Sequence, residues 1–219
     1  MSQLQGLIFD FDGLILETEL PIFQSWRQLF TEYGAELELG TWVRCVGSSY
    51  DAFNPALHLE EQIGTAVDRE ALHRRAQIDS NVIIDNQQPL PGVQSLLEDA
   101  RQHHLKLAVA SSSDAAWVHR HLQRLNLEKY FLAVCTSDDV AEVKPNPALY
   151  QLALQQLDLQ PAEAIAFEDS PNGIRAARLA GLRCIAVPNP VTQSLDFSHA
   201  NAIITSLAEI NLQTLFLLE

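Results

Sequence analysis

Two pairs of acidic side chains each follow a short apolar run in the chain. Asp10 and Asp12 come after "GLIF", and Glu168 and Asp169 come after "AIAF". Like charges in one place repel one another unless a cation lies among them, and carboxylate oxygens without cysteine or histidine are ligands that Mg²⁺ prefers. If the two runs end side by side, these residues predict a magnesium site that would attract an anionic group such as a phosphate.

Serine and lysine side chains that could bind a phosphoryl group lie elsewhere in the chain. Ser111, Ser112 and Ser113 come after the apolar run "LKLAVA", and Lys144 lies in "VKPNP". A hydroxyl can hydrogen-bond a phosphoryl oxygen, and an ammonium group can neutralise its charge. Each cluster alone is also typical of a turn or a helix N-cap. The functional interpretation therefore depends on the clusters meeting at one place.

The apolar runs that precede most of these residues are typical of short buried strands. They occupy residues 7–9, 105–110, 164–167 and 183–187, and a further strand is expected at 201–205. Helical patterns lie at residues 93–103, 114–125, 147–157 and 172–180. Strands that alternate with helices predict an α/β fold with a Rossmann-like parallel sheet, in which ligands bind beyond the carboxyl ends of the strands. Most of the polar clusters come directly after the expected strands.

Residues 19–88 have a different pattern. They contain helix-like stretches at 23–33 and 69–79 and no convincing core strand. We therefore expect an all-helical cap domain at 19–88, inserted after the first acidic motif into a core domain formed by residues 1–18 and 89–219. The exit sequence "QQPLPGV" has the proline and glycine content of a hinge, so the cap is expected to close over the site.

The amino-acid composition limits which kinds of binding partner and which cellular compartment are expected. The formal net charge of -14 argues against nucleic-acid binding, because no basic stretch interrupts the acidic balance. The N-terminus lacks a basic region followed by a long apolar segment, and no stretch approaches the roughly 20 apolar residues of a membrane span. The 3 cysteines are far apart, which is typical of a reducing compartment. We expect a cytoplasmic protein with no membrane or nucleic-acid partner, and a monomer by default.

Four motifs in chain order resemble those of the haloacid dehalogenase superfamily of phosphatases. They are "DFDGL" at residues 10–14, Ser111 after "LAVA", Lys144 in "VKPNP", and "ED" at residues 168–169. With a helical insertion directly after the first motif, the chain is similar to the branch that contains β-phosphoglucomutase and phosphoglycolate phosphatase. The resemblance runs through the whole expected core domain and implies a Mg²⁺-dependent phosphatase acting on a small phosphomonoester.

The resemblance also implies roles for single residues. Asp10 would be the nucleophile that forms an aspartyl-phosphate, and Asp12 would be the general acid for the leaving group and then the base for water. Ser111 would bind a phosphoryl oxygen, and Lys144 would neutralise charge. The metal would be held by Asp10, Asp169 and the backbone carbonyl of Asp12.

Two questions remain open within this resemblance. Glu168 would either bind the metal directly or support the residues that do. Substrate contacts are expected from Ser112 and Ser113 and, in the cap, from Ile22, Ser48 and Tyr50. The substrate itself would be a small phosphorylated metabolite such as a sugar phosphate.

The residues found at single positions distinguish between the candidate reactions. Dehalogenases of this superfamily lack the aspartate found here at Asp12, so phosphoryl transfer is favoured. Phosphonoacetaldehyde hydrolases need a cap lysine for a Schiff base, and no lysine precedes Lys106. A non-catalytic module that only binds phosphate is expected to have lost at least one residue of the motif set, and the chain retains Asp10, Asp12, Lys144 and Asp169.

A sugar-phosphate mutase is the nearest alternative, because it also passes through a phosphorylated aspartate. A mutase must hold the distal phosphate of a bisphosphate, which requires cationic groups on or near the cap. The mutases that the chain resembles carry such groups where this sequence has Ile22, Tyr50, Gln77 and Asp114. The sequence therefore favours net hydrolysis.

Overall fold

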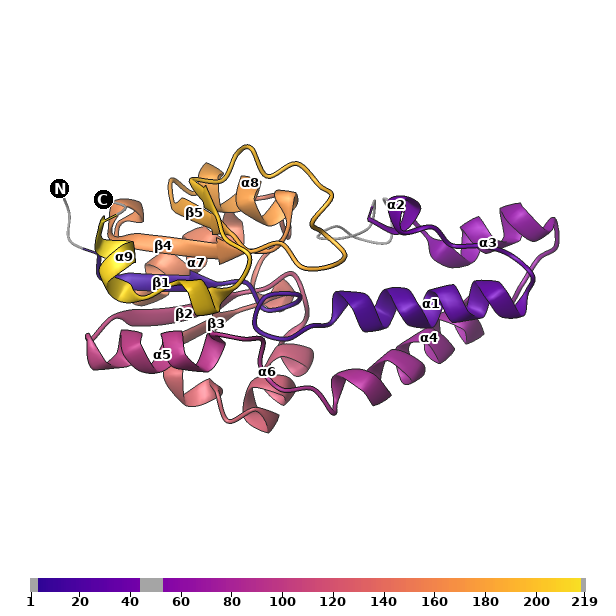
Figure 1. Ribbon diagram of the computed structural model, residues 1–219, viewed down its shortest axis with the longest axis horizontal. Helices are drawn as coiled ribbons and strands as arrows, with labels where there is room; N and C mark the ends of the chain where they lie inside the picture. The colour runs from indigo at the N-terminus through magenta and orange to yellow at the C-terminus, as the bar shows by residue number, and fades with distance from the viewer. Residues whose placement is uncertain (1–3, 44–52, 218–219) are drawn as a thin grey trace.

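The computed structural model describes residues 4–43 and 53–217. Its centre is a 6-stranded parallel sheet with the order β3-β2-β1-β4-β5-β6 (Figure 1). The strands are β1 (Gly6–Phe9), β2 (Lys106–Ala110), β3 (Ala133–Cys135), β4 (Ala164–Glu168), β5 (Arg183–Ala186) and β6 (Ala202–Ile203). The strand order reverses between β1 and β4, and α/β sheets bind ligands at such a point.

Helices connect the strands and also form the segment between β1 and β2. The α-helices are α1 (Glu19–Glu32), α2 (Leu39–Trp42), α3 (Pro55–Ile63), α4 (Arg69–Ile84), α5 (Val93–Gln102), α6 (Ala115–Arg124), α7 (Ala148–Leu157), α8 (Pro171–Leu179) and α9 (Leu212–Leu217). Short 3₁₀ helices are η1 (Glu128–Tyr130), η2 (Ser137–Asp139), η3 (Pro161–Glu163) and η4 (Leu207–Glu209). No helix in residues 4–43 or 53–217 has the length and apolar character needed to cross a membrane.

The two faces of the sheet are covered by different helices because successive strand side chains alternate. Leu7 and Phe9 pack in an apolar cluster with side chains of α5, α6 and α9, whereas Ile8 packs on the opposite face with α7 and α8. Small residues such as Ala108 and Ala166 line the face under α7 and α8. Burial on both faces explains why the strands read as continuous apolar runs.

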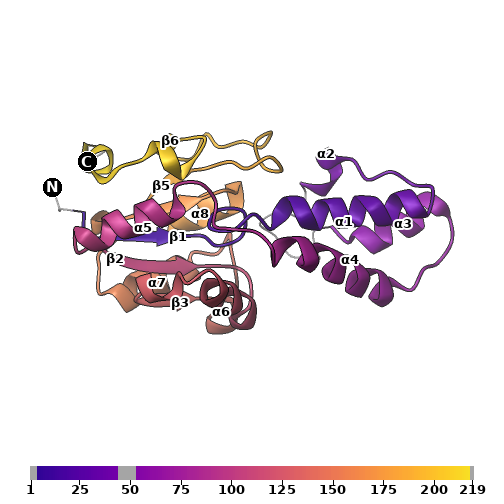
Figure 2. The ribbon, with the colours of Figure 1, turned by 60° about the horizontal axis from the view of Figure 1, so that its bottom comes forward.

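Helices α1 to α4 lie beyond the carboxyl ends of the strands, beside the sheet (Figures 1 and 2). Trp26 and Phe30 of α1 share an apolar cluster with Leu72 and Ala76 of α4. The Ser25 hydroxyl, buried in the same contact, donates to the Ala76 carbonyl at 2.9 Å. Trp26 is 1% exposed, so it belongs to the buried packing of this helical segment.

The α/β fold class is confirmed, but several elements differ from the sequence expectations. Strand β3 was not expected because its three residues are too few to show a period. Helix α1 begins at Glu19 rather than at residue 23, since Pro21 is tolerated in a first turn. Helix α4 continues to Ile84, past Ser80 and Asn81, which resemble helix breakers. Ser80 is buried there and donates to a carbonyl of its own helix.

Candidate active site

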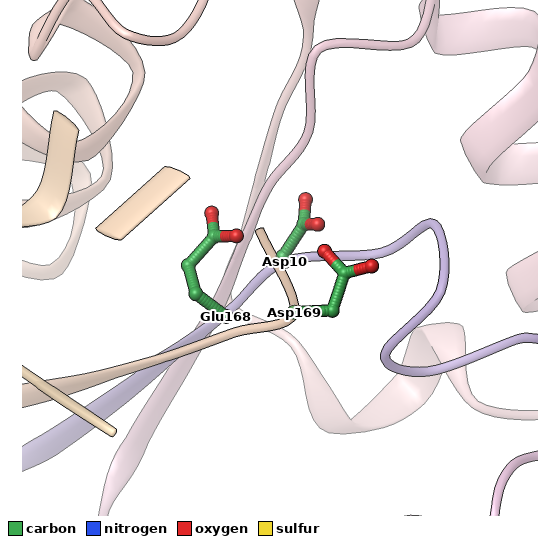
Figure 3. Close-up of side chains that lie close together, drawn as sticks. All are labelled: Asp10, Glu168 and Asp169. Carbon is green, nitrogen blue, oxygen red and sulfur yellow. The ribbon is translucent and has the colours of Figure 1, made fainter. Parts of the chain in front are cut away.

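Three acidic side chains converge where β1 and β4 end. The strands pair with Phe9 opposite Phe167, and the Asp10 amide donates to the Phe167 carbonyl at 3.0 Å. Asp10, Glu168 and Asp169 each offer a carboxylate oxygen, and these oxygens lie within 4.8 Å of one another (Figure 3). All three residues are buried, at 7%, 0% and 2% exposure. The parallel register thus brings together residues far apart in the sequence.

Lys144 is the cation inside this cluster. Its Nζ lies 2.6 Å from Asp10 Oδ1 and 2.6 Å from Glu168 Oε1, and the residue is 4% exposed. Burial disfavours its charged form, but the two carboxylates outweigh burial and raise the Lys144 pKa above its usual value. One lysine against three carboxylates leaves the cluster with excess negative charge when all are ionised.

The pKa values of two of these carboxyl groups are raised. Burial, and then the charge of Glu168, raise the pKa of Asp10 from 3.8 to about 7. Burial and the charge of Asp10 raise the Asp169 pKa well above its usual value. A divalent cation among the oxygens would favour the ionised carboxylates and so counter both shifts. The donor set, made of carboxylate oxygens only, therefore fits a hard divalent metal ion.

Glu168 has hydrogen-bond donors at both oxygens. Oε1 accepts from Lys144 and from the Tyr150 hydroxyl at 2.6 Å, and Oε2 accepts from the Ser170 hydroxyl at 3.2 Å. Helix α8 passes so close that a Cβ on Gly173 would lie 1.9 Å from Oε2. These contacts hold the Glu168 carboxylate in place, with Oε1 directed at Lys144.

Asp169 is held from the opposite side. The Asn189 side-chain amide donates to Asp169 Oδ2 at 2.6 Å, and Asp10 Oδ1 is engaged by Lys144. Each aspartate thus keeps a second oxygen for a ligand. Gly13, at φ 76°, makes this arrangement possible, since a Cβ there would lie 2.3 Å from Asp169 Oδ2.

Asp12 points away from the acidic cluster toward the segment after β2. Its Oδ2 accepts from the Ser113 hydroxyl at 2.6 Å and lies 3.4 Å from the Ser111 hydroxyl. Its Oδ1 accepts from the Trp117 indole Nε1 at 2.9 Å. The two aspartates of the first motif therefore occupy different surroundings.

A cavity of about 560 Å³ lies between the core loops and the helical segment. Its core side is formed by Ser112, Ser113, Asp114, Trp117 and Ser137. Its other side is formed by Ile22, Trp26, His73, Arg74, Ala76, Gln77, Ser80 and Asn81 of α1 and α4. Aromatic rings, hydroxyls and amides dominate this lining.

The structure thus places three of the expected substrate contacts at the cavity. Ile22, Ser112 and Ser113 line it, whereas Ser48 and Tyr50 lie outside the described residues. The Ser112 Oγ is buried and has no hydrogen-bond partner among the described residues, so it is available to a ligand.

The first residue of α1 adds another carboxylate near the site. Burial, followed by the charges of Asp12 and Glu17, raises the pKa of Glu19 to about 8. The sequence pattern gave no signal for this proximity, because Glu19 reads as an ordinary acidic residue in a first helical turn.

Comparison with known proteins decides the family. The sequence matches the family "Haloacid dehalogenase-like hydrolase" over residues 7–187. YhcW of Bacillus subtilis (strain 168), provisionally named a phosphatase, is 42% identical over 212 residues, which cover 97% of this chain and 96% of YhcW. The chain belongs to the haloacid dehalogenase-like hydrolase family.

Two further similarities concern named sugar-phosphate enzymes. The fructose-1-phosphate phosphatase YqaB of Escherichia coli (strain K12) is 32% identical to this haloacid dehalogenase-like hydrolase over 185 residues, 83% of this chain and 95% of YqaB. A crystal structure from Thermotoga maritima, provisionally named β-phosphoglucomutase, superposes with a TM-score of 0.77 at 28% identity, covering 97% of this chain and 98% of that one.

Four residues complete the site of this haloacid dehalogenase-like hydrolase without having been expected from the sequence. They are Trp117, Tyr150, Gly173 and Asn189. Asn189 could have been found, because it closely follows the strand expected at 183–187, as the other site residues follow theirs. Trp117 and Tyr150 lie on helices whose apolar faces gave no sign that their N–H and O–H groups reach the site.

Proposed function

We propose that this hydrolase is a divalent-metal-dependent phosphatase that hydrolyses a small sugar phosphate through a covalent aspartyl-phosphate at Asp10. The observation that carries the proposal is the buried cluster of Asp10, Glu168 and Asp169 around Lys144. A cavity of about 560 Å³ is lined by Ser113, which donates to Asp12 of the same motif. The similarity to YhcW and YqaB supports phosphate-ester hydrolysis as the reaction.

The reaction consists of two displacements at phosphorus. In the first, an Asp10 oxygen forms a bond to phosphorus, the ester P–O bond breaks, and Asp12 gives its proton to the leaving alkoxide. In the second, Asp12 takes a proton from water, the water oxygen attacks phosphorus, and the bond to Asp10 breaks. The products are the free alcohol and inorganic phosphate, with both aspartates restored.

Three side chains are proposed to bind the phosphoryl group. Lys144, already in contact with Asp10, neutralises charge as the nucleophile approaches. Ser111 and the unpartnered hydroxyl of Ser112 donate hydrogen bonds to phosphoryl oxygens. These groups are fixed at the ends of strands or in the loops that follow, so little reorganisation is needed when substrate binds.

We propose Mg²⁺ as the metal because every candidate ligand is an oxygen. Asp10, Asp169 and the Asp12 backbone carbonyl would hold it. When bound, the cation would neutralise the repulsion between the carboxylates and the incoming phosphate. We assign Glu168 to positioning Lys144, because donors already occupy both of its oxygens.

The cavity supports a sugar as the alcohol part of the substrate. Tryptophan rings offer apolar faces to C–H groups, and the hydroxyls and amides around them can bind sugar hydroxyls. Trp117 supplies a ring, and Gln77 and Asn81 supply the polar groups.

The cavity lining favours hydrolysis over mutase chemistry, although one structural relative is provisionally named a mutase. Of the four positions where similar mutases carry cations, three line the cavity here as Ile22, Gln77 and Asp114. Arg74, the arginine in the described lining, has a side chain 63% exposed and paired with Glu70 at 3.3 Å. The described lining therefore offers little positive charge to bind a second phosphate.

We further propose that residues 19–88 form a cap domain on a core of residues 1–18 and 89–219. All but one of the buried residues of one apolar cluster lie in the cap, the exception being Val191 of the core, and the polar residues of α4 face the core across the cavity. Closure would narrow the cavity around the sugar and limit access of water until the covalent step is complete.

The proposal is tested with a panel of hexose and pentose monophosphates, following free phosphate and isomerised sugar phosphate separately. We expect phosphate release that requires Mg²⁺, stops with EDTA, and is lost in Asp10→Asn. Asp68→Asn is the matched control, since Asp68 is the exposed N-cap at the start of α4, does not line the cavity, and asparagine caps equally well. Isomerisation with little phosphate released would overturn hydrolysis in favour of a mutase.

A further inference from the structure

Three donors hold the Asp12 carboxylate, and all come from the segment that follows β2. Trp117 Nε1 donates to Oδ1 at 2.9 Å, Ser113 Oγ donates to Oδ2 at 2.6 Å, and Ser111 Oγ lies 3.4 Å from Oδ2. We propose that Trp117 is a positioning residue that fixes the Asp12 carboxylate so that Oδ2 carries and delivers the proton to the leaving group. The inference rests on the role of Asp12 in the proposed function.

Trp117 is itself held in place at several points. Its backbone amide donates to the side chain of Asp114, the N-cap of α6, at 2.7 Å. Its ring packs edge-on against His121, with ring centroids 4.3 Å apart, and His121 is fully buried next to Phe11. An indole fixed by a helix cap and a buried ring presents its N–H in one direction.

The chemistry of the donors determines which oxygen can hold a proton. An indole nitrogen only donates, so Oδ1 must remain an acceptor while it faces Trp117. A serine hydroxyl rotates and can either donate or accept, so Ser113 tolerates a proton on Oδ2. Trp117 therefore directs the proton of Asp12 to Oδ2. Ser113 itself lines the cavity, which places Oδ2 next to the proposed leaving-group site.

Trp117 has two simpler possible roles, packing and substrate stacking, because its ring also lines the cavity. Loss of packing would reduce the rate for every substrate by the same factor. Loss of stacking would depend on the shape of the substrate. Loss of positioning would depend on how much the leaving group needs a proton, since nitrophenolate departs readily without one and phenolate does not.

The test uses Trp117→Phe and a series of substituted phenyl phosphates of nearly constant shape. The quantity compared is kcat/KM, which reports the steps up to departure of the leaving group. We expect kcat/KM to fall by about tenfold or more for phenyl phosphate and by clearly less for p-nitrophenyl phosphate, since a misdirected acid loses part of its catalytic factor. An equal loss across the series would overturn the proposal and leave packing or substrate stacking as the role.

A second comparison uses Asp12→Asn as the background. With no acid to position, Trp117→Phe should no longer change the dependence on leaving group. Ser113→Ala, which removes the other close donor, should steepen the dependence in the wild-type background. A Trp117→Phe effect that persists unchanged without the Asp12 carboxylate would contradict the proposal.

The contact can also be tested without turnover, which separates this proposal from the proposed function. The chain has 3 tryptophans, so the indole N–H resonances are few enough to resolve. Asp12→Ala should shift the Trp117 indole proton upfield and speed its exchange, leaving those of Trp26 and Trp42 in place. An unmoved Trp117 resonance would overturn the proposal even if Trp117→Phe failed to fold. Absence of hydrolysis in the wild type would count against the phosphatase reaction instead.

Discussion

Removing the Tyr150 hydroxyl should destabilise the folded protein by about 2 kcal/mol. The hydroxyl donates to Glu168 Oε1 at 2.6 Å, and both residues are 0% exposed, so water has no access to replace it. A hydrogen bond to a charged group contributes about 1.5–3 kcal/mol, and Tyr150→Phe keeps the ring and therefore creates almost no cavity. For a protein of this size the loss corresponds to a fall in melting temperature of roughly 4–8 °C.

The measurement is the free energy of unfolding from urea titration, with thermal unfolding as a second readout. Tyr130→Phe is the matched control, because Tyr130 also donates to a glutamate, Glu98, at 3.2 Å but near the surface. We expect a clearly smaller loss there. Tyr150→Phe with wild-type stability, or a Tyr130→Phe loss of equal size, would refute the argument that burial makes the Glu168 contact strong.

Two further predictions concern charge and close packing at the site. The pKa of Asp10 is raised from 3.8 to about 7 by burial and by Glu168, so the folded state resists its ionisation, and stability in EDTA should fall as pH rises from about 4 to 7. Thermal unfolding across that range should show this slope, Mg²⁺ should offset it near pH 7, and Asp10→Asn should reduce it, with the raised pKa values of Asp169 and Glu19 keeping part of it; a rising slope would contradict it. Gly173→Ala places a Cβ 1.9 Å from Glu168 Oε2 and should cost about 1–3 kcal/mol and most activity. Gly40→Ala, where nothing lies within 4 Å, should cost neither, and similar losses in both variants would show that the contact with Glu168 is not the cause.

The sequence was sufficient to predict that Asp10, Glu168 and Asp169 would meet. Each follows an apolar run, and runs of that length and composition form parallel strands whose carboxyl ends share one edge. Lys144 was a candidate from its residue type, but no strand was expected before it, because Ala133–Cys135 is too short to show a pattern. Its position in the fold became clear only from the sheet order.

Contacts that depend on how helices pack could not be predicted in the same way. Trp117 and Tyr150 lie on amphipathic helices, and periodicity identifies the buried face of a helix but not which polar atom ends beside a strand. The long pairing of α1 with α4 likewise places Gln77 and Asn81 at the cavity. In the sequence these two residues read only as polar positions of a surface helix.

The central claim, that Asp10 carries the phosphoryl group, is tested most directly by trapping that group. The enzyme is mixed with substrate and Mg²⁺, quenched in acid and treated with borohydride, which reduces an acyl phosphate to an alcohol. We predict homoserine at position 10 in the peptide containing "IFDFDG", found by mass spectrometry only when substrate is present. Reduction at Asp12 or at another carboxylate, or continued turnover by Asp10→Asn, would contradict the account.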